Sequence, residues 1–185
     1  MKNLVKILLA FVLALSVTLH LSNSIAEAKK TSYLMNTKKA YTYAYGNPTD
    51  NVGKYTVEFW RKDNGYNQWS TTTTDMYGDG YGFGEKETKN GLYVNGQKVL
   101  PYPIKKGKKW KDGNSTYIIR SVNRTVKTPA GTFKNVVEVR QTVKDFGYYT
   151  SYYAPSVGVI LEESNTPHSK HKTVTHIKLI KLKNK

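Results

Sequence analysis

The sequence predicts a mainly β protein: a single antiparallel meander that curls into a half-barrel, a barrel or a sandwich, with at most one short helix. Three observations lead to this fold class. The chain is rich in tyrosine, threonine, valine and glycine, its apolar residues recur at alternate positions rather than at helical spacing, and turn residues separate the runs. A helix is expected, if anywhere, within 29–40, although no firm amphipathic pattern is present there.

The N-terminal half is expected to contain paired strands. In 41–46 aromatic residues alternate with small ones. In 54–62 Tyr55, Val57 and Phe59 fall on one face, while Thr56, Glu58 and Trp60 fall on the other. The turn sequence DNGY follows, and 67–77 returns the chain, so a long hairpin is expected.

The next hairpin is marked by Asn95-Gly96 within 92–100, because this pair suits the two positive-φ positions of a type I′ turn. The stretch 75–87 before it is interpreted as a hairpin tip rich in glycine and tyrosine, and the glycine-rich patch 78–84 is too short to separate two domains. In the tail, β-branched residues favour a strand over a basic helix on a membrane surface. Further strands are predicted at 116–126, 132–143, 148–154, 157–163 and 172–182.

A tight turn is predicted at 128–131, because Pro129 fixes φ and Gly131 tolerates a positive φ. The residues beyond it alternate as in a half-buried antiparallel strand. One face is expected to carry Phe133, Val137, Val139 and Val143, and the other Lys134, Glu138 and Arg140.

The first 28 residues have the features of a secretory signal peptide. Lys2 and Lys6 precede an apolar run over 7–21, and Ala26-Glu27-Ala28 has small residues where signal peptidase requires them. We expect cleavage after this triplet, leaving 29–185 as one β-rich extracellular domain. An uncleaved membrane anchor is the alternative, but the run falls short of the roughly 20 apolar residues of a bilayer span. No other stretch is apolar enough to cross a membrane.

Charge and cysteine content restrict the partners. The formal net charge is +16, from 29 Lys and Arg against 13 Asp and Glu, and there is no cysteine for a disulfide or a lipid anchor. The charge predicts salt-sensitive binding to anionic wall polymer or acidic polysaccharide; alternatively, it serves solubility. We expect a monomer, no specific nucleic-acid partner, no cofactor and no transmembrane segment after cleavage.

The best candidate for a polyanion contact is the segment 104–113, because lysines that are clustered in a loop raise the local positive potential. The alternative is a solvated loop whose Trp110 packs inward. The 15 tyrosines could also form a glycan-binding face, although tyrosine is a strong strand former in its own right. The lysines concerned are Lys105, Lys106, Lys108, Lys109 and Lys111.

Other constellations have weaker support. The acids of 75–87 (Asp75, Asp79, Glu85 and Glu87) lack EF-hand spacing, which favours a hairpin tip over a calcium loop. A glycosidase would need two nearby carboxyls, drawn from Glu58, Asp75, Asp79, Glu85, Glu138 and Glu162. His168, His171 and His176 would bind a metal only if they converge, and surface histidines are the simpler interpretation. We therefore assign no catalytic, cofactor-binding or metal-binding residue.

Three segments carry a family resemblance: PIKKGKKW (103–110), TPAGTFKNVVEV (128–139) and YYAPSVGVI (152–160). In order and spacing they resemble an uncharacterised family of secreted or lipoprotein-like, β-rich domains of Gram-positive bacteria. The shared landmarks are Pro-x-x-x-Gly-x-x-Trp, Thr-Pro-Ala-Gly-Thr-Phe and Tyr-Tyr-Ala-Pro-x-Val-Gly. The resemblance covers about the C-terminal half of the mature chain and implies an extracellular β domain, with no catalytic residues to transfer. The landmark residues suit turns, core anchors and a bend between strands: Gly107, Trp110, Pro129, Gly131, Phe133, Tyr153, Pro155 and Gly158.

Together these observations predict a secreted, non-catalytic protein that is extracellular or associated with the cell wall and contacts anionic polymer through basic loops. Two alternatives stay open. A small secreted hydrolase of glycan or wall polymer would need a concave pocket with two converging carboxylates. A half-barrel carrier of an apolar ligand would need an interior that is not fully packed.

Overall fold

A computed structural model describes residues 31–46, 53–73, 82–166, 170 and 172–185. The chain divides into two compact units, Met1–Thr31 and Ser32–Lys185, and every described strand belongs to the second. The predicted signal peptide lies outside the described residues. Within the described ranges there is no helix, and hence none that is long and apolar enough to cross a membrane.

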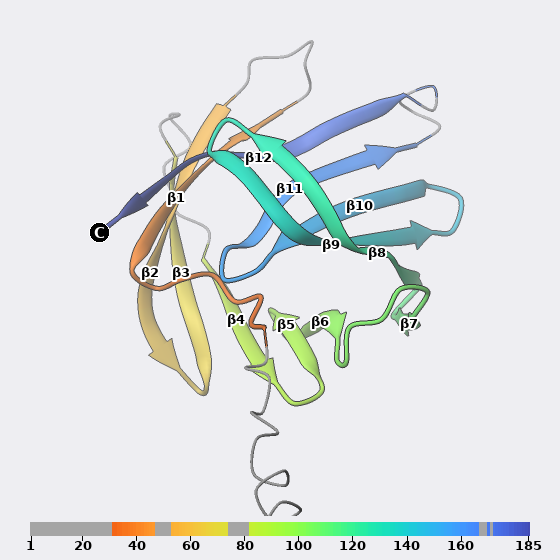
Figure 1. Cartoon of the computed structure of the whole chain (residues 1–185), viewed down its shortest axis with the longest axis horizontal. Helices are drawn as coiled ribbons and strands as arrows, with labels where there is room; N and C mark the ends of the chain where they lie inside the picture. Colours follow the sequence, from red (N-terminus) through yellow and green to blue (C-terminus); the bar gives the residue numbers. More distant parts are fainter. Residues whose placement is uncertain (1–30, 47–52, 74–81, 167–169, 171) are drawn as a thin grey trace, which may run out of the picture. The chain divides into compact units, whose positions relative to one another are not determined.

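The described residues form a single antiparallel sheet of twelve strands (Figure 1). The strands are β1 (Lys39–Tyr45), β2 (Gly53–Asp63), β3 (Tyr66–Thr73), β4 (Phe83–Thr88), β5 (Gly91–Val94), β6 (Gln97–Pro101), β7 (Lys109–Asp112), β8 (Ser115–Thr128), β9 (Gly131–Val143), β10 (Gly147–Ala154), β11 (Gly158–Asn165) and β12 (Thr173–Asn184). Their order in the sheet is β6-β5-β4-β3-β2-β1-β12-β11-β10-β9-β8-β7. The mainly β, antiparallel prediction is therefore confirmed.

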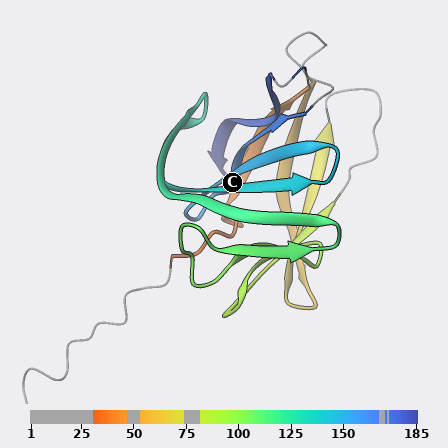
Figure 2. The ribbon, with the colours of Figure 1, turned by 90° about the vertical axis from the view of Figure 1, so that its right-hand side faces the viewer.

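The sheet curls into a nearly closed barrel, which decides between the architectures that the sequence left open (Figures 1 and 2). The strands that come first and last in the chain, β1 and β12, pair from Lys39↔Asn184 to Tyr45↔Ile177. This pairing joins the meander β1–β6 to the meander β7–β12. The sheet ends at β6 and β7, which are not paired with each other. Side chains cross this seam instead: Trp110 Nε1 donates to the Lys98 carbonyl at 3.0 Å.

Several predicted turns are present. Asn64 and Gly65 (φ 49° and 78°) join β2 to β3, and Asn95 and Gly96 (φ 49° and 82°) join β5 to β6. Both pairs have the two positive φ angles that a type I′ hairpin requires. Gly131, with φ 143°, opens β9 after the turn at Pro129.

Two strands were not predicted from the sequence. β4 lies in the stretch interpreted as a glycine-rich hairpin tip, and β7 lies in the lysine-rich segment interpreted as a loop. Both are short and carry charged residues, so they lack the β-branched alternation that indicates a strand. The strand predicted at 67–77 is observed as β3 up to Thr73, and residues 74–77 lie outside the described part of the chain.

The predicted alternation along β9 is confirmed for Val137 and Val139, which share one core cluster, but it is wrong for Phe133. Asn135 takes φ 55°, and the β8–β9 register shifts in the same region. The shift changes which side chains share a face, so four consecutive residues, 136–139, are buried. Phe133 therefore packs with the cluster that contains Val136, whereas Val137 belongs to a different cluster.

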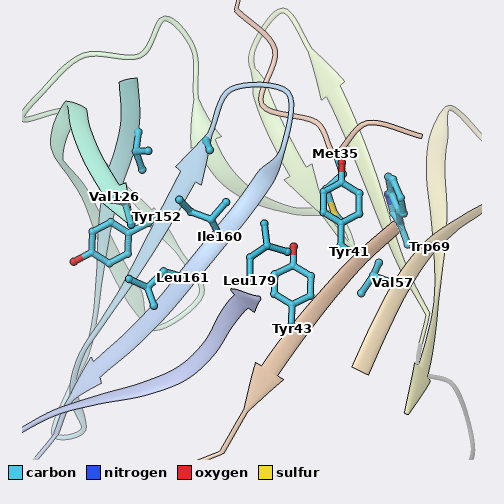
Figure 3. Packing of buried hydrophobic residues seen from close by; sticks show 12 residues of the cluster. Met35, Tyr41, Tyr43, Val57, Trp69, Val126, Tyr152, Ile160, Leu161 and Leu179 are labelled. Atoms are coloured by element: carbon cyan, nitrogen blue, oxygen red, sulfur yellow. The ribbon is translucent and has the colours of Figure 1, made fainter. Parts of the chain in front are cut away.

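The core contains two clusters of buried side chains. One is centred on aromatic residues of β1–β3, and Tyr41 meets Trp69 edge-on with ring centroids 5.8 Å apart (Figure 3). The other joins β5 and β6 to β8–β10 and includes Leu92, Leu100 and Ile119. Each buried aromatic pair contributes about 0.5–1.5 kcal/mol beyond the burial of its area.

Candidate functional site: an acidic cavity and a basic loop

The barrel encloses a cavity of about 320 Å³. Aliphatic and aromatic side chains make up most of its wall, and Tyr43, Tyr55, Tyr117 and Tyr153 are among them. The polar lining residues are Glu85, Gln97, Gln141, Ser151 and Glu162. Among the described lining residues there is no lysine, arginine or histidine, so the charged groups of this wall are carboxyls.

Glu85, on β4, is the more deeply buried of the two carboxyls, with 4% of its surface exposed. Its Oε2 accepts a hydrogen bond from the Met35 N–H at 3.1 Å. Burial raises the pKa of Glu85 to about 7, against the opposing effects of this hydrogen bond and of the nearby Trp69 indole. The Trp69 Nε1 does not itself reach standard hydrogen-bond geometry with any described partner, so we assign it an electrostatic contribution only.

Glu162, on β11, is partly buried and accepts a hydrogen bond from Ser151 Oγ at 2.8 Å. Burial raises its pKa, while the Ser151 hydrogen bond and the charge of His176 act in the opposite direction. Burial also raises the pKa of Tyr43 and of Tyr153, and both carboxyls add to each increase. The two phenols therefore lie within electrostatic range of both Glu85 and Glu162.

The N-terminal segment Ser32–Asn36 covers one end of the cavity. Tyr33 and Met35 are buried, and Met35 lines the cavity. Glu87 Oε1 accepts a hydrogen bond from the Tyr33 N–H at 3.3 Å. Glu87 and Tyr33 each lie two residues along the chain from the partners of the Glu85–Met35 hydrogen bond. Alternate glutamates of β4 thus fasten alternate backbone N–H groups of this segment.

The other end of the cavity meets solvent. Segment 32–36 precedes β1, whereas Tyr55 and Ile177 pair with residues near the far end of that strand. Gln97 is exposed there, and its Nε2 donates to the Tyr117 hydroxyl at 2.6 Å. The result is a pocket with a polar rim, apolar walls and a covered base.

The lysine segment 104–113 leads into β7, the strand at one edge of the sheet. The Gly107 N–H donates to the Ile119 carbonyl at 2.8 Å, and Gly107 has φ 84°. Trp110 points inward and stacks on Tyr117 with ring centroids 5.1 Å apart. Its neighbours Lys109 and Lys111 on β7 are exposed.

Structure divides the five candidate lysines into two kinds. Lys105, Lys106, Lys109 and Lys111 are exposed. Lys108 is partly buried, and its Nζ donates to the carbonyls of Tyr102 at 3.0 Å and Pro103 at 3.4 Å. Four side chains can therefore meet a partner in solution, while Lys108 holds the loop in shape.

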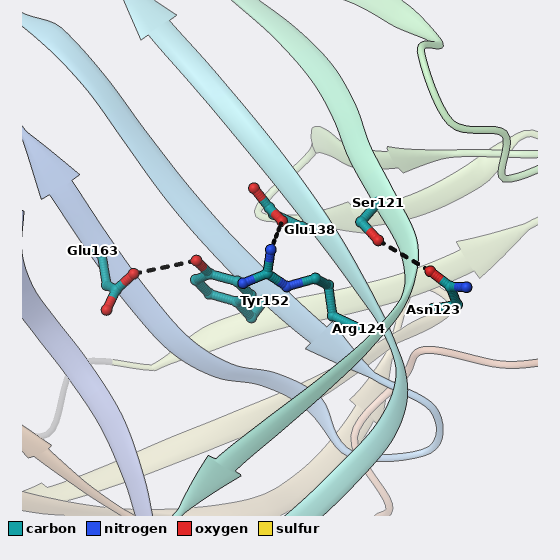
Figure 4. A network of polar contacts seen from close by, with 6 residues as sticks. All are labelled: Ser121, Asn123, Arg124, Glu138, Tyr152 and Glu163. Atoms are coloured by element: carbon teal, nitrogen blue, oxygen red, sulfur yellow. Dashed lines mark hydrogen bonds and ion pairs between the residues drawn. The ribbon is translucent and has the colours of Figure 1, made fainter.

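The remaining candidate acids are dispersed. Glu58 is exposed on β2, 3.9 Å from Lys185 Nζ. Glu138 pairs with Arg124 at 3.2 Å, beside the contact between the Tyr152 hydroxyl and Glu163 (Figure 4). Asp75 and Asp79 lie outside the described residues. Of the six carboxyls considered for a glycosidase, Glu85 and Glu162 are the two that the structure places on the cavity wall.

The histidines are not brought together in the described part of the chain. His168 and His171 lie outside it, and the exposed His176 is hydrogen-bonded to Ser164 Oγ at 2.6 Å. Among described residues no group of three His, Cys, Asp or Glu side chains is arranged for a metal ion. Glu85 and Glu87 serve the N-terminal segment rather than a calcium loop.

The family landmarks occupy structural positions. Pro129 is exposed in the β8–β9 turn, and Phe133 packs against the first core cluster. Tyr153 lines the cavity, while Pro155 lies in the turn between β10 and β11. Gly158 begins β11 with φ 80°, and a Cβ there would lie 2.6 Å from Met35 Cγ.

Three lining residues, Gln97, Gln141 and Ser151, were not predicted as site residues, and Glu162 was considered only as one of six candidate carboxyls. No local signal marks them. They converge because the sheet curls, and a register such as Ser151↔Glu162 is set by the whole strand pair.

Comparisons with known proteins show similarity in fold. No family model matches the chain, and no curated protein matches it. A presumed exported protein of Bacteroides fragilis with a YmcC-like fold is 13% identical, with a TM-score of 0.51, over 83% of this chain and 100% of that one. A presumed lipoprotein of Parabacteroides distasonis is 12% identical, with a TM-score of 0.52, over 83% of this chain and 99% of that one. At these identities the likeness extends to the barrel fold alone, and the Gram-positive resemblance stays an expectation.

Proposed function

We propose that this chain is an exported, non-catalytic protein of the cell envelope that binds anionic wall polymer or polysaccharide through its exposed lysines. The N-terminal signal features and the lack of a cysteine support export without a lipid anchor. The names of the two structural neighbours, a presumed exported protein and a presumed lipoprotein, agree with an envelope location. The motif resemblance supports a Gram-positive source.

The observation that carries the proposal is the separation of charge between inside and outside. Glu85 is buried and Glu162 is partly buried, and both line the cavity, so these two carboxyls do little to offset the positive exterior. Lys105, Lys106, Lys109 and Lys111 are exposed together at one sheet edge. A cluster of cations at the sheet edge suits repeated phosphate or carboxylate groups, because clustered lysines raise the local positive potential.

The test is retention of the mature protein on purified cell wall as salt is increased. A variant that replaces the four exposed lysines of 105–111 with glutamine is expected to bind less and to depend less on salt. By analogy with single-stranded nucleic acid, the slope of log affinity against log salt should fall by roughly 0.7 for each lysine that meets a phosphate.

A matched control removes the same charge from scattered exposed positions: Lys62, Lys89, Lys127 and Lys134. This control is expected to retain more of the wall binding than the variant in 105–111. Equal losses would show that total charge matters and the cluster does not. Retention that ignores salt, or no retention of the native protein, would contradict the proposal as a whole.

The cavity supports a second candidate function, the binding of a small ligand inside the barrel. The interior is not fully packed, which is the condition that a carrier requires. A polymer hydrolase is less well supported, because Glu85 lies at the covered end, where an extended glycan chain would not reach it.

A further inference from the structure

The inner wall of the barrel has the opposite charge from the protein as a whole. The chain carries a net charge of +16, yet Glu85 and Glu162 are the charged groups among the described residues that line the cavity. Three acids outside the cavity lie in ion pairs: Glu138 is 3.2 Å from Arg124, Glu58 is 3.9 Å from Lys185, and Asp63 is 3.8 Å from Arg61. No such ion pair is present for Glu85 or Glu162 within the described ranges.

Buried carboxylates without a counter-charge are costly, because the apolar wall cannot replace the water that would solvate them. Glu85 accepts the Met35 N–H beside the Trp69 indole, and Glu162 accepts the Ser151 hydroxyl and lies within electrostatic range of the exposed His176, but neither carboxyl has an ion-pair partner among the described residues. A chain so rich in lysine and arginine could readily have supplied an internal partner. A bound ligand with a positive charge could therefore supply the counter-charge that Glu85 and Glu162 lack inside the cavity.

We propose that the cavity binds a small organic cation, with its ammonium group between Glu85 and Glu162 and its apolar body against the tyrosine rings. Both carboxyls act electrostatically on Tyr43 and Tyr153, so a cation placed near these phenols would be attracted by both. Tyr43 also stacks on Tyr55, with centroids 5.3 Å apart and planes 22° apart, and presents aromatic surface to the same space. Ammonium groups are attracted to such faces as well as to carboxylates.

The size and polarity of the cavity narrow the ligand class. A volume of about 320 Å³ is at the small end of the range for ligand sites, which fits a single ring with a short side chain. An anion would meet the two carboxyls, and a purely apolar ligand would desolvate them further. The positive exterior slows the approach of a cation, but it acts on the association rate more than on the affinity.

The experiment compares three ligands that share a phenyl ring and differ in the end group: 2-phenylethylammonium, 2-phenylethanol and 3-phenylpropanoate. Binding to the native protein is measured by calorimetry or by ligand-observed NMR at about pH 8, where Glu85, with a pKa of about 7, is mostly ionised. The cation is expected to bind roughly tenfold or more tightly than the alcohol, and the carboxylate most weakly. Equal affinity for the alcohol, a preference for the carboxylate, or no binding of any ligand at millimolar concentration would each overturn the proposal.

Variants then test the assigned residues. Glu85→Gln and Glu162→Gln should each remove most of the preference for the ammonium over the alcohol while leaving the alcohol's affinity nearly unchanged. Glu58→Gln, which removes an exposed carboxylate outside the cavity, should leave all three affinities unchanged. If the Glu85→Gln/Glu162→Gln double variant still prefers the ammonium ligand over the alcohol, the assignment of these two residues is wrong. If that variant does not fold, the comparison of the three ligands on the native protein decides the proposal. Wall retention depends on the outer lysines, so the proposed function can fail or succeed independently of this site.

Discussion

Glu85 holds the N-terminal segment by a hydrogen bond, and its contribution to the free energy of unfolding depends on pH. Its carboxylate accepts the Met35 N–H, yet the surrounding apolar wall disfavours its charge. Because its folded-state pKa of about 7 lies above the ordinary value of 4.5, the native state holds the proton more tightly than the unfolded chain does. The stability that this contributes is fully present below about pH 4.5 and is lost as the pH rises through about 7.

The native protein should therefore lose up to roughly 3 kcal/mol of unfolding free energy from this group between about pH 4.5 and 8. Glu85→Gln keeps a carbonyl to accept the Met35 N–H but has no proton to lose, so its stability profile should be flatter. Urea unfolding at several pH values measures both slopes. Glu162 contributes a slope of the same sign and remains in this variant.

Glu58→Gln is the control for this comparison, because Glu58 is exposed on β2 and lies outside the cavity. It should follow the native profile. If Glu85→Gln also follows the native profile, the carboxyl of Glu85 is ionised in the folded protein without penalty, and the account of its burial is wrong.

At the scale of elements, the strands that could be predicted are those with alternating buried and exposed residues or with a recognisable turn sequence at one end. β2 alternates a buried Val57 with exposed Glu58 and Trp60, and the β5–β6 turn carries its Asn-Gly pair. β4 and β7 were not predicted, because they are held by contacts with other segments and not by a pattern within their own sequence. In β4 the buried face is a glutamate that binds another segment. In β7 it is Trp110, which stacks on Tyr117 of the neighbouring β8 and donates a hydrogen bond across the seam to the Lys98 carbonyl.

The docking of the N-terminal segment onto the β10–β11 turn depends on Gly158. An alanine there would need an unfavourable φ of 80° and would place Cβ 2.6 Å from Met35 Cγ. Gly107→Ala is a matched control, since its φ is 84° and an added Cβ would meet nothing within 4 Å. We expect Gly107→Ala to cost about 1 kcal/mol from backbone strain and Gly158→Ala roughly 1–3 kcal/mol more.

Denaturant unfolding measures both costs, and limited proteolysis within 32–36 reports whether the segment has loosened. Gly158→Ala should expose this segment to cleavage, whereas Gly107→Ala should not. Equal costs and equal protection in the two variants would mean that Met35 does not hold the segment against the turn.

At the scale of the whole molecule, the curling of the sheet into a barrel creates the cavity, which could not be predicted from the sequence. The cavity joins Glu85 on β4 to Glu162 on β11, two residues that lie far apart in the chain and follow no shared motif. Their meeting depends on the β1–β12 pairing and on the curl of the sheet, which are long-range properties. The basic cluster, by contrast, could be read from the sequence because its lysines are neighbours, and structure was needed only to separate Lys108 from the rest.

The most direct measurement is residue-by-residue mapping of amide NMR shifts while the mature protein is titrated with soluble polyphosphate at low salt. We expect the largest shifts in 104–111, little change at the cavity-lining positions of β4 and β11, and reversal of the shifts on addition of salt. Shifts spread evenly over the basic surface, or concentrated at Glu85 and Glu162, would contradict it.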